Sequence, residues 1–302
     1  AIYFYREMAE YIRIEIELLR ERHDVIAIEC DTRWPRPLLV ARLVRRADLV
    51  VTWFASWHAL LPALFCRLFG RPFVVTVGGY DTAYLPEIGY GHQRGGIRRL
   101  ISRMVLRLAT RIIAISEHTR DEVLALGAPP DRVVLVRPGL DPARYTGGPA
   151  GKRDLVVTVG GVHESNRLRK GLEPFVRAAA LMPELEFVLI GAWTDGTIER
   201  LRAIAPPNVR FTGAVSHEVK VHWLAGARVI VQASLHEAFG QAVAEGMLCG
   251  CVPVVTRAGA LPEVVGDAGV VVDHADPEVL AAGIRMALAL GRDGQERARA
   301  RA

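Results

Sequence analysis

The sequence predicts an α/β protein of two tandem, doubly wound domains, each built on a parallel sheet. Short apolar, β-branched runs alternate with helix-sized segments along the whole chain. A glycine- and proline-rich stretch interrupts this alternation near the middle, and a chain of 302 residues is long enough to form two separate cores. Because alternating strands and helices form right-handed βαβ units, we expect parallel sheets.

The first half contains five strand-like runs separated by helix-sized segments: DVIAIE, DLVVTWF, FVVTV, RIIAI and RVVLV. The opening stretch YFYREMAEYIRIEIELL has a helical pattern, so we expect a helix over residues 3–19 and expect the domain's first strand to precede the sequence. The stretch RPGLDPARYTGGPAGKRD interrupts the hydrophobic periodicity of both strands and helices and is interpreted as a linker. We therefore expect an N-terminal domain over 1–145 and a C-terminal domain over 146–302.

The second half repeats the same alternation with six strand-like runs: DLVVTVG, EFVLIG, NVRFTG, ARVIVQAS, CVPVVT and AGVVVD. Helical patterns lie between them, among them KGLEPFVRAAALM and DPEVLAAGIRMALAL. In doubly wound sheets, ligands bind beyond the carboxyl ends of the strands. The loops that follow the strands are therefore the place to look for functional residues.

Charge and cysteine content restrict the setting of the protein. The net charge of +5 arises in the first half, because residues 151–302 contain as many basic as acidic residues. The four cysteines have neither CxxC nor metal-ligand spacing, and no uninterrupted apolar run reaches the roughly 18 residues of a membrane span. These features favour a reducing, cytoplasmic setting. They leave an anionic membrane surface as a candidate contact for the basic half.

Several common catalytic motifs are absent from the sequence. No G-x-G-x-x-G follows a strand, and no P-loop, Asp-x-Asp or G-x-S-x-G motif occurs. In HEVKVH the two histidines, His217 and His222, diverge around a helix, so a zinc site is rejected. Because Asp-x-Asp would hold a divalent ion on a diphosphate, its absence favours a phosphate site without a metal. We expect no metal and no cofactor.

Two glutamates stand in the apolar segment SLHEAFGQAVAEGMLCG. Glu237 lies in the loop after a strand, and Glu245 lies within the short helix that begins at Phe239 and Gly240. A helix start offers unpaired N–H groups, and glycine allows a ligand to approach the backbone, so a diphosphate fits there. A carboxylate in such a segment needs hydrogen-bond donors, which sugar hydroxyls supply. From spacing alone, pairing of Glu245 with an arginine or a backbone N–H stays the alternative, with Glu237 facing water.

A family resemblance rests on these residues and their surroundings. HEAFGQAVAEGMLCGCVPVV, followed by GALPEVVGDAGVVV, resembles the E-x7-E signature of the retaining glycosyltransferases of family 4, which have the GT-B fold. TVGGVHESNRLRKGLEPFVRAAALMPELEFVLIGA is similar to that family's donor-phosphate segment. The resemblance covers nearly all of 151–280 and is patchier before it. It implies two Rossmann-like domains, the second of which binds a nucleotide-sugar.

The resemblance also implies roles for individual residues. Glu245 is expected to accept hydrogen bonds from the ribose, Glu237 to face the sugar and diphosphate, and Lys170 to offset the charge of the departing phosphate. The expected donor-binding residues are Gly161, Arg167, Arg169, Lys170, Glu237, Ala238, Phe239, Gly240, Gln241 and Glu245. Gly161 stands where the family often has an arginine. Arg167 and Arg169 are both candidates to replace it, and the sequence does not decide between them.

The acceptor side is expected in the first half, at FVVTVGGYDTAYLPEIGYGHQRGG. Gly78 fills the position at which relatives often have a histidine, so no residue of this chain takes over the role of that histidine directly. Asp81 is the catalytic candidate here, and Tyr80, Glu87, Tyr90 and His92 are candidates for the sugar and acceptor site. The alternative is a structural loop whose polar groups satisfy the backbone.

Two further segments of the first half have a structural and a functional interpretation. IRRLISRMVLRL, residues 97–108, is basic and amphipathic, with Ile97, Leu100, Ile101, Met104, Val105 and Leu108 on one face of a helical wheel. Such a helix either packs this face on the sheet, which we favour, or lies on an anionic membrane. Trp53, Trp57 and His58 are either sugar-stacking or packing residues.

The sequence therefore predicts a retaining, metal-independent hexosyltransferase that uses a UDP- or GDP-sugar and a glycan or lipid-linked acceptor, and that binds no nucleic acid. Glu237, Lys170 and Asp81 are its catalytic candidates. The alternatives are a nucleotide-sugar epimerase of the same fold and a non-catalytic nucleotide- or glycan-binding module. The base, the sugar and the acceptor depend on pocket shape, which the sequence does not specify.

Overall fold

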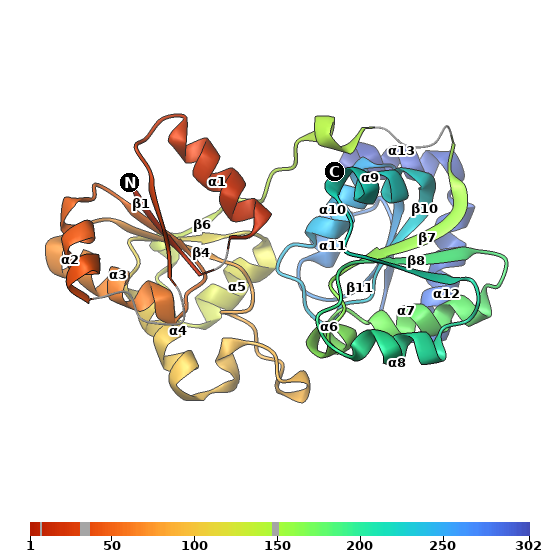
Figure 1. Cartoon of the computed structure of the whole chain (residues 1–302), viewed down its shortest axis with the longest axis horizontal. Helices are drawn as coiled ribbons and strands as arrows, with labels where there is room; N and C mark the ends of the chain where they lie inside the picture. Colours follow the sequence, from red (N-terminus) through yellow and green to blue (C-terminus); the bar gives the residue numbers. More distant parts are fainter. Residues whose placement is uncertain (7, 31–36, 147–150) are drawn as a thin grey trace. The chain divides into compact units, whose positions relative to one another are not determined.

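The computed structural model of the chain describes residues 1–6, 8–30, 37–146 and 151–302. They form two compact units, Ala1–Arg137 and Pro138–Ala302, and each unit has a six-stranded sheet whose neighbouring strands are parallel (Figure 1). This confirms the predicted α/β class with two parallel-sheet domains. Part of the expected linker, residues 147–150, lies outside the described residues, and the boundary expected at 145 and 146 stays a prediction.

The first unit alternates strands and helices from its start. Its elements are β1 (Ile2–Tyr5), α1 (Glu10–Arg20), β2 (Ile26–Glu29), α2 (Pro37–Arg46), β3 (Val50–Trp53), α3 (Trp57–Phe69), β4 (Phe73–Val77), α4 (Gly96–Leu108), β5 (Arg111–Ala114), α5 (Glu117–Ala125) and β6 (Val133–Leu135). Two 3₁₀ turns, Pro86–Ile88 and His92–Arg94, lie in the long loop between β4 and α4. The five strands expected from the apolar runs are confirmed.

Strand β1 corrects the expected helix over residues 3–19. The helix begins only at Glu10, and Ile2–Tyr5 form an interior strand between β2 and β3. All four β1 side chains are buried, so no polar alternation marks the strand in the sequence. The aromatic residues Tyr3 and Phe4 favour extended backbone, and their complete burial outweighs the helical periodicity of the residues that follow.

Helices α2, α3 and α4 are neighbours on the sheet of the first unit, since α3 contacts both of the others (Figure 1). Helix α4 does not turn its expected face inward. Val105 and Leu106 are buried together with Ser102, whose hydroxyl donates to the Asp81 carbonyl oxygen at 3.0 Å, whereas Ile97 and Leu100 are exposed. The hydrogen bond of Ser102 holds the helix in a rotation that leaves part of its apolar face outside. The expectation that the whole face packs on the sheet is therefore wrong.

The second unit has the same alternation of strands and helices. They are β7 (Arg153–Val159), α6 (Glu164–Arg169), α7 (Leu172–Ala178), β8 (Glu186–Ile190), α8 (Thr197–Ile204), β9 (Val209–Gly213), α9 (His217–Gly226), β10 (Ala227–Gln232), α10 (Gln241–Leu248), β11 (Val252–Thr256), α11 (Leu261–Val265), β12 (Val270–Val272) and α12 (Pro277–Ala289), and α13 (Gly291–Arg301) follows them. The six strands expected here are confirmed.

The strand order of the second unit positions its site. The order is β12, β11, β10, β7, β8, β9, so the chain winds one way from β7 and the other way from β10. Helices cover both faces, and the largest cluster of buried side chains, which includes Phe175 and Phe187, lies between the sheet and α7, α8 and α12. A doubly wound sheet has its crevice where the winding direction changes, at the carboxyl ends of the two central strands. Here those strands are β7 and β10.

Among the described residues, no helix is both long enough and apolar enough to cross a membrane.

Candidate active site

The loops that follow β7 and β10 place Glu237 among four hydrogen-bond donors. Its Oε1 atom lies 2.7 Å from Lys170 Nζ and 3.3 Å from Arg169 Nη1, and it accepts from Ser234 Oγ at 3.0 Å and from Gln232 Nε2 at 3.2 Å. Its other oxygen, Oε2, accepts no hydrogen bond from the described residues. One carboxylate oxygen is therefore anchored, and the other is available to a ligand.

Two opposing effects set the pKa of Glu237. Burial would raise it, but the charges of Lys170 and then Arg169, with hydrogen bonds from Lys170 and Ser234, outweigh burial and lower the pKa from 4.5 to about 2. The carboxylate is therefore ionised at neutral pH. Two cations, Lys170 and Arg169, face this one carboxylate, and cations at this position suit an anionic ligand.

Two glycines bring Lys170 against the end of the sheet. A side chain at Gly160 would place its Cβ 2.8 Å from Lys170 Cδ, so the lysine stem passes directly over this residue. Gly171 has φ +61°, and a Cβ there would lie 2.1 Å from the carbonyl oxygen of Ala233. Only glycine allows this close approach of the α6–α7 turn to the end of β10.

Glu245 lies in α10, and both of its oxygens have partners. Oε2 is 2.7 Å from Lys220 Nζ in α9, and Oε1 accepts from the Tyr145 hydroxyl at 3.1 Å and from Gln241 Nε2 at 3.4 Å. The side chain is only 5% exposed. Gly240 precedes the helix with φ +98°, a left-handed conformation that suits glycine. Glu245 is thus a buried, charge-paired carboxylate.

Both glutamates line one pocket of about 260 Å³ at the start of α10. Its walls are Lys170, Gln232, Glu237, Gly240, Gln241, Ala242 and Glu245. The backbone N–H groups of Gln241 and Ala242 donate to no described residue, as expected for the first turn of a helix. The pocket therefore combines free N–H groups, the positive end of a helix dipole, a lysine and two carboxylates.

The other expected donor-binding residues differ in which side chains and backbone groups they contact. Arg169 contacts Glu237 directly, but Arg167 is held by Glu164, at 2.7 Å, and by Glu173. Gly161 follows β7, and its carbonyl oxygen accepts from an asparagine of α6. Ala238 and Phe239 are half-buried in the loop that leads to α10. Of the two arginine candidates, the structure brings only Arg169 to the glutamate.

In the first unit, Asp81 is completely buried and ties two strand ends together. One carboxylate oxygen accepts from the backbone N–H of Ala55, after β3, at 2.8 Å, and the other from that of Gly78, after β4, at 3.1 Å. Burial raises the pKa of Asp81 to about 6, and these backbone N–H groups oppose the rise. The contacts are those of a residue that positions a loop.

The remaining acceptor candidates form an aromatic cluster above Asp81. The Tyr80 ring packs edge-on against Tyr90 and His92, with ring centres 4.9 and 4.8 Å apart. Burial lowers the pKa of His92 to about 4, so its imidazole is neutral at pH 7. Glu87 projects to the surface from a 3₁₀ turn. The loop is ordered by its own aromatic packing.

His58 is a packing residue of the same unit. It is buried at the start of α3, and its Nε2 lies 2.9 Å from the Trp53 carbonyl oxygen and 3.2 Å from Thr52 Oγ1. Burial lowers the pKa of His58 to about 4. Trp57 packs edge-on against its ring. The packing interpretation therefore fits His58 better than sugar stacking.

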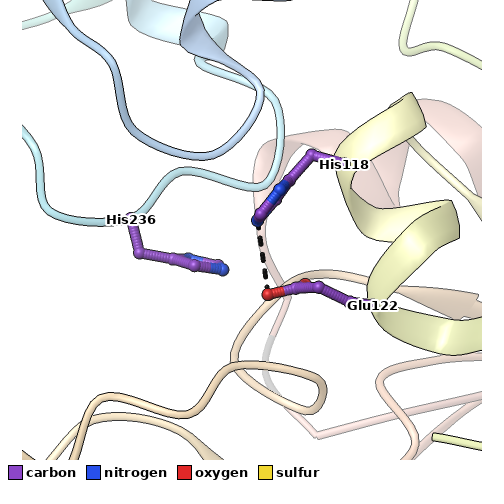
Figure 2. Close-up of side chains that lie close together, drawn as sticks. All are labelled: His118, Glu122 and His236. Carbon is purple, nitrogen blue, oxygen red and sulfur yellow. Dashed lines mark ion pairs between the residues drawn. The ribbon is translucent and has the colours of Figure 1, made fainter. Parts of the chain in front are cut away.

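A hydrogen bond links helix α5 to the loop between β4 and α4, and an ion pair lies within the helix. His118 Nε2 lies 3.3 Å from Glu122 Oε1 one helical turn away (Figure 2). Thr82 Oγ1 donates to Glu122 Oε2 at 2.6 Å. His236, also labelled in Figure 2, belongs to the second unit, where its carbonyl oxygen accepts from Arg169 at 3.1 Å. Each of these contacts lies within one unit.

Two partners of Glu245 were absent from the expected site. Lys220 precedes it by 25 residues and Tyr145 by 100, so only the folded chain shows the contacts. A compositional signal did exist, because the chain has only three lysines among its 38 basic residues. Two of those three, Lys170 and Lys220, contact the two glutamates of the E-x7-E pattern.

Family models of known proteins match both halves of the chain. The family model of group 1 glycosyl transferases matches residues 153–289, and that of the glycosyl transferase 4-like domain matches residues 9–139. The O-antigen chain mannosyltransferase B of Escherichia coli is 28% identical over 197 residues, which cover 60% of this chain and 52% of that protein. The D-inositol 3-phosphate glycosyltransferase of Mycolicibacterium vanbaalenii is 29% identical over 210 residues, 60% of this chain and 46% of that protein. The chain thus spans about half the length of these curated relatives.

A solved structure shows the same fold at low sequence identity. Anabaena HepE in complex with UDP has a TM-score of 0.79 and 17% identity, and the match covers 99% of this chain and 93% of that one. The two family models each match one unit, and the fold of the chain is that of this structural neighbour. Residues 9–139 thus match the glycosyl transferase 4-like domain, residues 153–289 match the group 1 glycosyl transferases, and the chain has the GT-B fold.

Proposed function

We propose that the chain transfers a sugar from a nucleotide-sugar, bound by the second unit, to a glycan or lipid-linked acceptor, with retention of anomeric configuration and without a metal ion. One observation carries this proposal. The pocket at the start of α10 holds two carboxylates, the half-buried Glu237 and the buried Glu245, beside Lys170 and free helix N–H groups. Carboxylates suit sugar hydroxyls, and the cation and the N–H groups suit a diphosphate.

The donor would lie across the pocket with its parts matched to different groups. The diphosphate would accept hydrogen bonds from the N–H groups of Gln241 and Ala242 and pair with the charge of Lys170. The transferred sugar would face Oε2 of Glu237. The ribose hydroxyls donate to Glu245, which the contact with Lys220 holds in place. Because HepE is bound to UDP in its structure, a UDP-sugar is the first donor to test.

In the proposed reaction, the acceptor oxygen attacks the anomeric carbon on the face from which the diphosphate leaves. The bond from the anomeric carbon to the phosphate oxygen breaks, a bond to the acceptor oxygen forms, and the departing phosphate oxygen takes the acceptor proton. Lys170 and Arg169 offset the negative charge that builds on the leaving group, which is the part that a metal would otherwise play. Glu237 then serves as an anchor and sugar contact, with no covalent intermediate.

The first unit would supply the acceptor side through the loop between β4 and α4. We propose that Asp81 acts there as a positioning residue, because its carboxylate is buried and occupied by the N–H groups of Ala55 and Gly78. The Tyr80 and Tyr90 rings are the candidates for contact with the acceptor. The sugar, the acceptor and the setting in the cell belong to this proposal, including the cytoplasmic location expected from the cysteines.

The test is a panel of UDP- and GDP-sugars, scored by thermal shift and then by product analysis with and without acceptor. We expect one nucleotide series to stabilise the protein, transfer to depend on acceptor, the product to keep the donor's anomeric coupling in proton NMR, and EDTA to leave the rate unchanged. Free sugar released at full rate without acceptor would favour the epimerase instead. Donor binding without turnover would favour a binding module, and a glycosyl group trapped on Glu237 would refute the direct displacement.

A further inference from the structure

Three neighbouring helices of the first unit, α2, α3 and α4, contain no acidic residue. Helix α2 carries Arg42, Arg45 and Arg46, α3 carries Arg67, and α4 carries four more arginines. The other two helices of this unit differ, since α1 contains three glutamates and α5 contains three acidic residues. The positive charge of the first half is therefore gathered on one group of adjacent helices (Figure 1).

The same helices expose large aliphatic side chains between the arginines. We call the exposed residues of these helices the α2–α4 face. Leu68 of α3 is 70% exposed, and Ile97 and Leu100 of α4 are 67% and 57% exposed. Leu38 of α2 and Leu64 of α3 are exposed as well. Single exposed apolar residues are ordinary, but several on adjacent helices mark a surface that meets another apolar phase.

A pocket in this face is lined by guanidinium groups. Its volume is about 420 Å³, and its walls are Ala41, Arg42, Arg45, Arg46 and Phe69. None of the three arginines forms an ion pair with a described residue, so their charges are not neutralised within the described part of the chain. A guanidinium group can donate two parallel hydrogen bonds to two oxygens of one phosphate, so the pocket is suited to a phosphate group.

We propose that the α2–α4 face rests on an anionic lipid surface, with a lipid phosphate in the arginine pocket. Arginines alone would also suit a nucleic acid or an acidic polysaccharide. The exposed leucines favour lipid, because only a membrane interface offers apolar chains directly beneath a layer of phosphates. The face ends at the start of α4, directly after the loop between β4 and α4. This inference concerns the first unit and does not depend on the donor site in the second.

The test is co-sedimentation of the full chain with vesicles of phosphatidylcholine alone and of phosphatidylcholine mixed with phosphatidylglycerol. Two double variants remove the two components of the face separately: Arg45→Glu with Arg98→Glu, and Leu68→Ser with Leu100→Ser. The matched control, Leu18→Ser with Arg22→Glu, changes exposed residues on and just after α1, outside the face. Circular dichroism establishes that all variants keep their fold.

We expect wild type and control to bind only the anionic vesicles, less at high salt. The arginine variant should bind at least ~25-fold more weakly, since each arginine near an anionic surface contributes roughly fivefold. The affinity of the leucine variant for anionic vesicles should fall by about tenfold or more, because its apolar contact is lost. Equal sedimentation with both vesicle types, or variants that bind like the control, would overturn the proposal. Binding to RNA is measured in the same way. A leucine variant that binds both the anionic vesicles and RNA as wild type does would also overturn the proposal, because it would indicate a general polyanion-binding surface. Donor binding, measured in parallel, reports separately on the second unit.

Discussion

Replacement of Glu237 by glutamine tests the charge cluster of the pocket. Lys170 and Arg169 lower the pKa of Glu237 from 4.5 to about 2, which corresponds to roughly 3 kcal/mol in favour of the ionised form at about 1.4 kcal/mol per pKa unit. Glutamine keeps the shape but loses this charge, so Glu237→Gln should destabilise the second unit by about that amount at pH 7. For a domain of this size, that is a fall in Tm of roughly 6–12 °C.

The loss should also depend on pH in a defined way. Because the folded pKa of Glu237 lies below the unfolded one, its stabilisation is complete above pH 4.5 and is lost as the pH falls towards 2. The Tm difference between wild type and Glu237→Gln, measured by calorimetry, should stay constant from pH 7 to pH 5 and shrink below that. Glu184→Gln is the control, since Glu184 is exposed and has no ion pair with a described residue. A Glu237→Gln variant as stable as this control, or a difference that does not change with pH, would show that the two cations do not stabilise an ionised Glu237.

Three further predictions concern residues in both units. Lys170→Ala should lower kcat for sugar transfer by roughly 10²- to 10³-fold with a smaller effect on KM, because the lysine acts on charge that develops in the transition state; unchanged initial rates would contradict this. Lys220→Met should lower stability by roughly 3 kcal/mol, since it leaves Glu245 buried without its cation, and a Tm equal to wild type would rule out that role. The first unit should lose up to roughly 3 kcal/mol as the pH falls from about 6.5 to about 4, because burial holds the pKa of His58 near 4; His58→Asn should flatten this dependence, and an equally steep loss in that variant would contradict it.

Much of the fold was predictable because buried parallel strands appear as continuous apolar runs. Strands such as β10 and β11 have no polar face to interrupt the pattern, and a glycine lies just before each of them. Strand β1 was missed for a related reason. Its residues Ile2–Tyr5 are too few to establish a period, and they adjoin a strongly amphipathic helix. The rotation of α4 was missed because Ser102, a polar residue, faces inward through its hydrogen bond with the Asp81 backbone.

The site was predictable only where its residues lie close in sequence. Glu237 and Glu245 share one loop and helix, and the family resemblance, more than their spacing, predicted that both serve one site; they line one pocket. The choice between Arg167 and Arg169 required side-chain directions. Glu164, three residues before Arg167 on the same helix, was the signal that this arginine is held elsewhere. Lys220 depends on the packing of α9 beside α10, which local sequence does not encode.

The most direct test of the central claim is isothermal titration calorimetry of UDP and GDP with wild type, Glu245→Gln and the control Arg167→Gln. If the pocket at the start of α10 holds the nucleotide of the donor, one nucleotide should bind to wild type and to the control with equal affinity. Its dissociation constant should be roughly tenfold higher, or more, for Glu245→Gln, because this variant loses charged hydrogen bonds to the ribose. Equal affinity of all three proteins, or no binding of either nucleotide to wild type, would contradict the account.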